Sequence, residues 1–292
     1  MQLPEIERLC RAVVPGAGSI DLEPLGAGLL RETYRVARDG VAYTLKIAVE
    51  HRPDLGVDPS WEVRVLERAA GAGLAPRLVF FDLEGAILLS RWVEGRSWVS
   101  YGAAAPAHSV KIAELLRRVH DLAAPSPARQ VTPPQWIKIY ADALSRQSST
   151  TSDPALRKAA VARTESLAEL PRAVGVVCHS DLHAMNLIQE DDSLILLDWE
   201  YAHVTDPLWD LAGWCANNDF EAERQWSLLT HYLGDAPIPT QWQRFRLLLA
   251  LYDYVCLLWS ELYLSVRGHA DGVAERARLL DARLRLPAHY AA

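Results

Sequence analysis

The sequence predicts an α+β protein in which a small antiparallel sheet is followed by a larger helical part. Before about residue 93, five short segments alternate as β-strands do, and one helix interrupts them. From residue 96 onward, apolar residues recur at helical spacing. Late in the chain, two short apolar runs flank a loop rich in His, Asp and Asn. We therefore expect two domains, residues 1–93 and 94–292.

The composition narrows the class of protein. At 292 residues, half of them hydrophobic, the chain can bury a large core. The net charge of -7 argues against a nucleic-acid binder, which usually carries a basic field. The four cysteines are scattered without a CxxC pair, so they indicate neither a disulfide framework nor a metal site. No signal peptide is visible at the start, which predicts a cytoplasmic protein; oligomeric state is left open.

Turn and capping signals delimit the elements of the first part. Pro15 ends the first helix, Gly40 lies in a turn between two strands, and Asp58 is a favourable helix start. In order, the pattern predicts a helix at 4–13, strands at 20–26, 33–37 and 41–49, a helix at 61–70, and strands at 78–82 and 86–91.

Two features of the first part suit phosphate binding. Gly26 and Gly28 permit close approach of backbone to a phosphate, although a simple turn explains them equally well. Lys46 points to the face of its strand opposite to that of Leu45 and Ile47. A lysine in such a strand is usually no more than a solvated residue.

Helical periodicity dominates the second part. The apolar run Phe245–Leu264 is interrupted by Arg246, Asp253 and Glu261, which a membrane span would have to bury, so it predicts a core helix. The helices expected are one that includes residues 112–119, then 135–144, 154–170, 207–217, 221–233, 240–266 and 271–284.

The polar loop between the two late apolar runs carries the strongest chemical signal. Val176–Cys178 reads as a strand, Asp181 and Asn186 follow it, and a second strand at 194–197 leads to Asp198. This is the order of parts in kinase-type phosphoryl transfer: an Asp that orients the acceptor, a metal-binding Asn, then a metal-binding Asp after a strand.

These residues also carry a family resemblance. The run HSDLHAMN at 179–186, followed by DWE at 198–200, resembles the catalytic core of the aminoglycoside phosphotransferase and choline kinase superfamily. Members of that superfamily are small-molecule kinases with a protein-kinase-like fold of two lobes, and the likeness covers nearly the whole chain. It implies that the chain uses ATP and Mg²⁺.

The resemblance implies roles for the residues of the loop. Asp181 would accept a hydrogen bond from the acceptor hydroxyl, and Asn186 and Asp198 would bind Mg²⁺. His183 would donate to the γ-phosphate, although a solvated loop histidine is equally plausible. Two further residues are expected to be structural: His179, which would brace the loop, and Asp210, which would anchor its backbone.

The resemblance also assigns residues to the nucleotide. Lys46 would pair with the ATP phosphates, and Glu62 would pair with Lys46; Glu67 is the second choice for that partner. The hinge would run through residues 92–95, whose backbone would meet adenine. The cofactor-binding residues expected are Gly26, Gly28, Lys46, Glu62, Trp92, Val93 and Leu197.

The acceptor is expected to be a small hydroxylated cation such as choline, ethanolamine or thiamine. On one helix, Tyr252, Trp259 and Tyr263 fall close together, and aromatic faces with carboxylates attract such cations. An aromatic stripe of this kind is also typical of a protein core, and an aminoglycoside or amino sugar is the alternative acceptor. The acceptor residues expected are Glu200, Trp214, Asp219, Tyr252, Asp253, Trp259 and Tyr263.

Two other functions are compatible with parts of this pattern. His179, Asp181 and His183 could be read as the metal ligands of a hydrolase. That hypothesis leaves Asn186 and Asp198 without roles. A non-catalytic pseudokinase would usually lack one of the Lys, Asp, Asn and Asp residues, all of which are present here.

Overall fold

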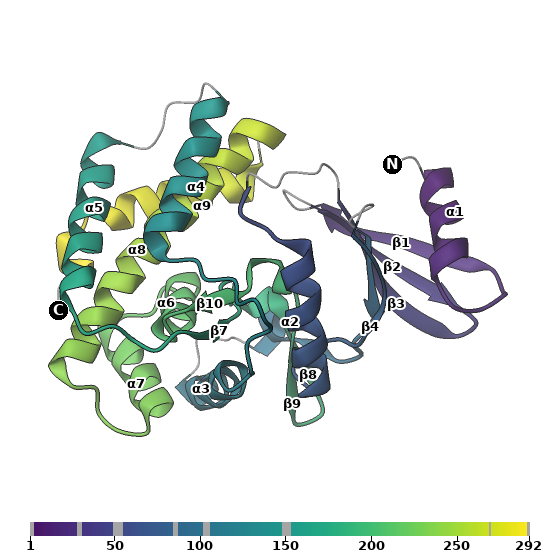
Figure 1. Ribbon diagram of the computed structural model, residues 1–292, viewed down its shortest axis with the longest axis horizontal. Helices are drawn as coiled ribbons and strands as arrows, with labels where there is room; N and C mark the ends of the chain where they lie inside the picture. The colour runs from purple at the N-terminus through teal and green to yellow at the C-terminus, as the bar shows by residue number, and fades with distance from the viewer. Residues whose placement is uncertain are drawn as a thin grey trace. The chain divides into compact units, whose positions relative to one another are not determined.

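In a computed structural model the chain folds as two compact units (Figure 1). The structure describes residues 3–27, 31–48, 55–83, 87–101, 106–147, 153–268 and 270–290. The first unit comprises residues 1–53, 57–100 and 185–200, and the second comprises 54–56, 101–184 and 201–292. The division therefore differs from the expected boundary at 93/94, because a segment from late in the chain joins the first unit.

A five-stranded antiparallel sheet forms the centre of the first unit. Its strand order is β1-β2-β3-β5-β4. Alternation places Leu45 and Ile47 in the core and leaves Lys46 on the other face, as predicted. The bounds are β1 (Ile20–Ala27), β2 (Arg31–Arg38), β3 (Val41–Ala48), β4 (Leu78–Asp82) and β5 (Ile87–Arg91).

Two helices accompany this sheet. The helix α1 (Leu3–Val13) buries Ile6 and Cys10 in the same hydrophobic cluster as the inward side chains of β2 and β3. The helix α2 (Pro59–Gly71) begins at Asp58, whose side chain accepts a 3.0 Å hydrogen bond from the Trp61 amide. Because α2 buries Trp61 and Glu62 on one face, a carboxylate is carried into the interior of this unit.

A small second sheet completes the first unit. It consists of β6 (Arg96–Ser97), β8 (Leu187–Glu190) and β9 (Ser193–Leu196), and the Leu196 amide donates to the Leu74 carbonyl at 2.8 Å. Gly95 precedes β6 with φ +147°, and a Cβ there would lie 2.4 Å from the Gln189 carbonyl oxygen, so only glycine fits. The sequence predicted β9 but not β6 or β8.

The second unit is mainly helical. The long helix α8 packs against α4, α5, α6 and α9. The two expected strands around the polar loop belong to different sheets, because β7 (Val176–Cys178) pairs with β10 (His203–Thr205) instead of β9. The helices are α3 (Pro106–His120), α4 (Pro133–Arg146), α5 (Pro154–Glu169), α6 (Leu208–Asn217), α7 (Ala222–Leu233), α8 (Pro239–Arg267) and α9 (Asp271–Leu284).

The helix α8 is long and apolar enough to cross a membrane, but 67% of its most apolar stretch is buried within the protein. Two charged residues in it are buried with partners. Arg246 donates to the Gln225 side chain and the His289 carbonyl, and Asp253 accepts from Arg283 and Tyr290. This is the packing of a core helix, which the interrupting charges predicted.

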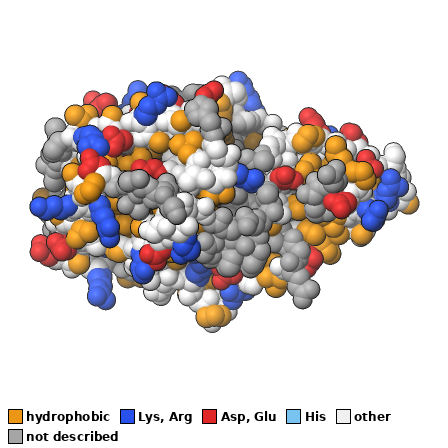
Figure 2. All heavy atoms as spheres, turned by 90° about the horizontal axis from the view of Figure 1, so that it is seen from above, with side chains coloured by type: hydrophobic (Ala, Val, Ile, Leu, Met, Phe, Trp, Pro, Cys, Tyr) orange, Lys and Arg blue, Asp and Glu red, His pale blue; other side chains and the backbone are white. Residues whose placement is uncertain are grey.

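Charged side chains of both signs lie on the described surface. On the face seen in Figure 2, acidic and basic groups are interspersed with hydrophobic ones. Such a mixture differs from the one-signed basic field that holds a phosphate backbone. A partner other than nucleic acid remains a prediction from the charge of -7.

Candidate active site

Five charged side chains form a cluster in the first unit. Lys46 Nζ lies 2.5 Å from Asp198 Oδ1. The Arg31 guanidinium donates to both oxygens of Glu62, at 2.7 and 2.5 Å, and its Nε lies 3.7 Å from Glu200 Oε2. The cluster thus holds three carboxylates against two cations.

The pKa values in the cluster report that excess of negative charge. Burial by itself would lower the pKa of Lys46 and of Arg31, but Asp198 and Glu62 respectively raise both above their ordinary values. Burial, followed by the charge of Asp198, raises the pKa of Glu200 to about 8. An additional cation among these carboxylates would be stabilised there.

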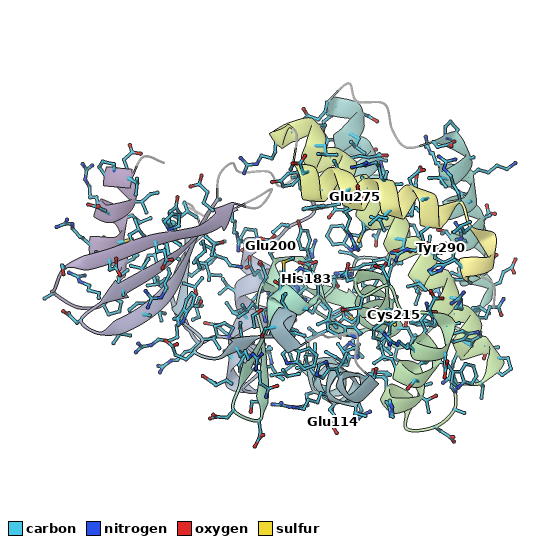
Figure 3. All side chains as sticks on the ribbon, turned by 180° about the vertical axis from the view of Figure 1, so that it is seen from behind. Glu114, His183, Glu200, Cys215, Glu275 and Tyr290 are labelled. Atoms are coloured by element: carbon cyan, nitrogen blue, oxygen red, sulfur yellow. The ribbon has the colours of Figure 1, made fainter. Side chains whose placement is uncertain are left out.

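The expected pairing of Glu62 with Lys46 is wrong. Glu62 binds Arg31 instead, because the planar guanidinium at the start of β2 matches a carboxylate through two parallel hydrogen bonds. Lys46 takes Asp198 as its partner. Glu200 (labelled in Figure 3) was expected at the acceptor but lies on the turn after β9, with its Oε2 3.7 Å from Arg31 Nε. Arg31 was not predicted to belong to the site, although a strand-opening arginine beside a glycine-rich turn was a signal.

Asn186 and Asp198 lie on two backbone segments that are joined by a hydrogen bond. The Asn186 carbonyl accepts a 2.8 Å hydrogen bond from the Leu197 amide, and the Asn186 side chain is buried. Asp198 has φ +66°, a left-handed conformation that a non-glycine residue adopts at a cost of about 1 kcal/mol or more. Their oxygen donors are of the kind that Mg²⁺ prefers, so this donor set fits the expected ion.

In the second unit, buried Asp210 on α6 holds the backbone of the polar loop that follows β7. Its two oxygens accept from the amides of His179 and Ser180, at 2.8 and 2.7 Å, and His120 Nε2 lies 3.2 Å away. Burial alone would raise the pKa of Asp210, but these donors, His120 first, hold it below its ordinary value. His179 Nδ1 in turn accepts from the Asp181 amide at 3.3 Å.

His183 lies beside Asp181, with Nε2 3.5 Å from Asp181 Oδ2. Both side chains are partly exposed. His179, by contrast, is fully buried and its Nδ1 is engaged by the loop backbone, so the three residues do not form the ligand set of a hydrolase. Within the described residues, the one His/Cys/Asp/Glu group with metal-like spacing is His120, Cys178 and Asp210, which already bond to one another.

Three residues expected to contact the acceptor are core residues. Trp214 and Asp253 are fully buried, and Tyr252 is 3% exposed. A Cβ on Gly213 would lie 2.9 Å from the Tyr252 ring, so the ring is packed directly against the backbone of α6. Because neighbours inside the protein enclose them, the prediction that these side chains line an acceptor site is wrong.

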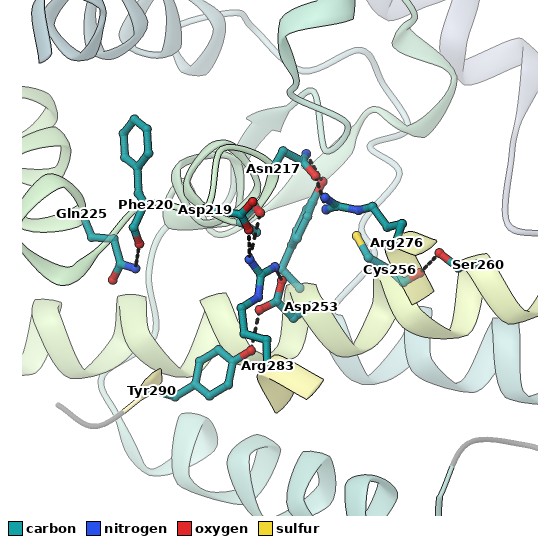
Figure 4. Close-up of polar contacts among 12 residues, drawn as sticks. Asn217, Asp219, Phe220, Gln225, Asp253, Cys256, Ser260, Arg276, Arg283 and Tyr290 are labelled. Carbon is teal, nitrogen blue, oxygen red and sulfur yellow. Dashed lines mark hydrogen bonds and ion pairs between the residues drawn. The ribbon is translucent and has the colours of Figure 1, made fainter. Parts of the chain in front are cut away.

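The expected flanking carboxylates are already neutralised by an arginine. Arg283 of α9 donates to Asp219 at 2.6 Å and also to Asp253, which accepts from the Tyr290 hydroxyl as well (Figure 4). Asp219 is exposed, but its charge is paired. Asp219 and Asp253 therefore neutralise Arg283 instead of attracting a cationic acceptor, and an attraction of that kind would have to come from aromatic side chains.

Trp259 and Tyr263 do lie together, as half-buried side chains whose ring centroids are 5.4 Å apart. Trp259 Nε1 donates to the Tyr201 hydroxyl at 3.1 Å, and Tyr201 lies 6.1 Å from Trp136 by ring centroids. We call these four residues the aromatic cluster. Tyr201 was not predicted to belong to the site, although its place directly after Asp198-Trp199-Glu200 was a signal.

His203 connects the aromatic cluster to the polar loop that follows β7. Its Nδ1 lies 2.9 Å from the Tyr201 carbonyl and 3.0 Å from Ser180 Oγ, and its Nε2 accepts from Trp136 Nε1 at 3.3 Å. Burial, with a smaller contribution from the charge of Arg129, lowers the pKa of His203 to about 4. The imidazole is therefore neutral at pH 7.

This histidine should make the protein less stable in mild acid. The unfolded state takes up a proton near pH 6.5, whereas the folded state resists protonation of His203 until about pH 4. Stability should thus fall as the pH drops from 6.5 to 4, by roughly 3 kcal/mol from this group. Urea unfolding across that range should show a smaller decrease in His203→Asn than in the unchanged protein. An equal decrease of the unfolding free energy in the two proteins would contradict the lowered pKa of His203.

The other residues expected to bind the nucleotide differ in their surroundings. Trp92 follows β5, and its amide donates to the Ala42 carbonyl at 3.1 Å, so it is not available to adenine. Val93 is half-buried next to it. A Cβ on Gly26 would meet no protein atom within 4 Å, so internal packing does not require glycine there. Gly28 lies outside the described residues.

Comparisons with known proteins identify the fold and the family of the chain. A 35-residue match, 49% identical and covering 12% of the chain, is to protein LicA of Haemophilus influenzae; it covers 13% of that protein. Choline kinase LicA from Streptococcus pneumoniae has a similar fold, with TM-score 0.78 and 24% identity over 97% of this chain and 98% of that one. A choline/ethanolamine kinase family protein from Mesorhizobium loti gives 0.78 and 23%, over 97% and 94%.

A third similar structure is the macrolide 2′-phosphotransferase from Brachybacterium faecium, with TM-score 0.63 and 18% identity over 95% of this chain and 98% of that one. These neighbours identify the fold as kinase-like. The family comparison goes further, because it matches residues 21–248, well over half of the sequence. The chain belongs to the phosphotransferase enzyme family.

Proposed function

We propose that this phosphotransferase uses ATP and Mg²⁺ to phosphorylate the hydroxyl of a small cationic acceptor, an amino alcohol such as choline or ethanolamine, or thiamine. The observation that supports this class most directly is the aromatic cluster. Trp259 and Tyr263 present half-buried rings, and His203 ties the cluster to Ser180, the neighbour of Asp181. Aromatic faces attract quaternary and primary ammonium groups without requiring a carboxylate.

In the proposed reaction, Asp181 accepts the hydrogen bond of the acceptor hydroxyl and aims its oxygen at the γ-phosphorus. The new P–O bond forms as the bond to the β–γ bridging oxygen breaks. ADP leaves, and the hydroxyl proton passes to Asp181. His183, 3.5 Å from Asp181, is in a position to influence that carboxylate.

Lys46 would pair with the phosphates, and Asn186 with Asp198 would hold Mg²⁺. When bound, the ion would neutralise charge on the phosphate oxygens. Arg31 and Glu62 would keep the surrounding charges in place through their two hydrogen bonds. The backbone at Val93 would meet adenine, with Gly26 and Leu197 also at the nucleotide.

An acceptor screen tests this proposal. We expect ATP-dependent phosphorylation of choline, ethanolamine or thiamine, and little of aminoglycosides or amino sugars. Trp259→Ala should raise the acceptor KM by about tenfold to thirtyfold, since a cation–π contact is worth up to about 2 kcal/mol when desolvated. The KM for ATP should not change. Transfer of radiolabelled phosphate from ATP measures both KM values.

A matched control is Trp226→Ala, which removes a half-exposed tryptophan that packs on Trp242 far from the aromatic cluster in sequence. It should leave the acceptor KM unaltered. Turnover restricted to amino sugars or aminoglycosides, or a choline KM that is insensitive to Trp259, would refute the small-cation class while leaving the phosphotransferase itself intact.

A further inference from the structure

One polar chain in the second unit reaches the catalytic loop from the C-terminal helices. The side chain of Asn217, the last residue of α6, donates from Nδ2 to the Leu182 carbonyl at 3.0 Å. Leu182 directly follows Asp181. The other side of the same amide, Oδ1, accepts a hydrogen bond from Arg276 on α9 (Figure 4).

Arg276 determines which way the Asn217 amide faces. A guanidinium has five N–H donors and no acceptor, so the oxygen of the amide must be the atom that meets it. The NH₂ group must then face the Leu182 carbonyl, which can only accept. Among the described residues, no carboxylate lies within ion-pair distance of Arg276, so Asn217 is the partner that the structure gives it.

Asn217 Nδ2 also lies 3.3 Å from the Tyr252 hydroxyl, whose ring is fixed against Gly213. The amide is therefore held by a buried residue of α8, by α9 and by the loop at once. Asp210 fixes the backbone on the near side of Asp181, at His179 and Ser180. Asn217 is the corresponding contact on the far side.

We infer that Asn217 is a positioning residue for catalysis: oriented by Arg276, it fixes the backbone after Asp181 and so aims that carboxylate at the acceptor hydroxyl. The inference rests on the proposed function, because it assigns Asp181 to that hydroxyl. It adds that the placement of α9, a helix remote in sequence from the loop, affects turnover.

The decisive variant is Asn217→Asp, which keeps the size and shape of the side chain. A carboxylate at 217 would pair more strongly with Arg276 but could not donate to the Leu182 carbonyl, since it has only acceptors. We expect kcat to fall by about ten- to a hundredfold, as for a catalytic group displaced by around 1 Å. The melting temperature and the KM for ATP should stay unchanged. A role in stability alone predicts instead a lower melting temperature with full kcat per folded molecule.

Asn218→Asp is the matched control. Asn218 neighbours Asn217 and is equally half-buried, but it caps the C-terminus of α6, and its Nδ2 donates to the Trp214 carbonyl of that helix at 2.8 Å. This variant should keep kcat. Arg276→Met should lower kcat severalfold, and should add nothing in an Asn217→Ala background if Arg276 acts through Asn217. Arg278→Met, on an exposed arginine paired with Glu275, controls for it.

The assay measures ADP release with ATP, Mg²⁺ and choline, and also the slow hydrolysis of ATP by water without an acceptor. Wild-type kcat in Asn217→Asp in both assays would overturn the inference. So would a loss of kcat that merely follows a loss of folded protein. If Asn217→Asp does not fold, an unchanged kcat in Arg276→Met would overturn it equally. Asp181→Asn distinguishes a failure of the proposed function from a failure of this inference. Full turnover in Asp181→Asn would refute the proposed function. An inactive Asp181→Asn together with a fully active Asn217→Asp would refute only the inference about Asn217.

Discussion

Asp181→Asn should lower kcat for phosphoryl transfer about a thousandfold, within the range of about 10²–10⁴ that a positioned acid–base group contributes. An amide cannot take the proton of the acceptor hydroxyl, although it can still occupy the same space. Binding of MgATP should remain nearly intact, because the residues proposed to hold it, Lys46, Asn186 and Asp198, belong to the first unit and Asp181 to the second. Pre-steady-state turnover and calorimetric nucleotide binding measure the two effects separately.

Asp142→Asn is a suitable control for that experiment. Asp142 is an exposed carboxylate on α4 that pairs with Lys138, so its loss should change neither quantity. A kcat within a factor of a few of the wild-type value in Asp181→Asn would show that another residue orients the acceptor. His183, the neighbour 3.5 Å away, would then be the first to test.

Asp198→Ala should weaken nucleotide binding, whereas Asp181→Asn should impair proton transfer from the acceptor. It removes an Mg²⁺ ligand of the proposed site and leaves Lys46, 14% exposed, without its 2.5 Å partner. We expect the affinity for ATP in the presence of Mg²⁺ to fall at least about a hundredfold, since even partners of metal ligands are worth about ten- to a hundredfold. Turnover should fall with it.

Two comparisons make this result specific. Asp192→Ala removes an exposed carboxylate from the turn between β8 and β9 and should bind MgATP normally. Treatment of the unchanged protein with EDTA should reproduce the loss seen in Asp198→Ala, and added Mg²⁺ should restore activity only in the unchanged protein. Activity that survives EDTA would contradict a metal at Asn186 and Asp198.

Long periodic elements were predictable from the sequence, whereas three of the short strands were not. The alternation around Lys46 identified β3 and its buried face, and 3.6-residue spacing identified α4 to α9 to within a few residues. The strands β6, β8 and β10, two to four residues long, carry too few residues for alternation to be visible. They exist because tertiary neighbours supply their hydrogen bonds, not because of local preference.

The candidate site, too, was predictable only in part. Asp181, Asn186 and Asp198 follow one another in a single stretch of chain. Their order alone therefore predicted that they belong to one site. Which charges pair is a property of three dimensions: nothing local indicated that Arg31 would bind Glu62. A helical stripe likewise cannot show which of its rings meets a neighbouring helix, and Tyr252 was buried by its fit against Gly213.

The discontinuous first unit also bears on when the protein can first bind its nucleotide during synthesis. Lys46 and Asp198 meet across 152 residues of sequence, and β8 and β9 join a unit whose other strands precede them by about a hundred residues. Since a ribosome releases the chain from the N-terminus at about 5–20 residues per second, a nascent chain carries the five-stranded sheet for several seconds before Asp198 emerges. During that interval Lys46 has no carboxylate at 198 to bind. Nascent chains stalled before residue 198 should therefore be unable to retain MgATP.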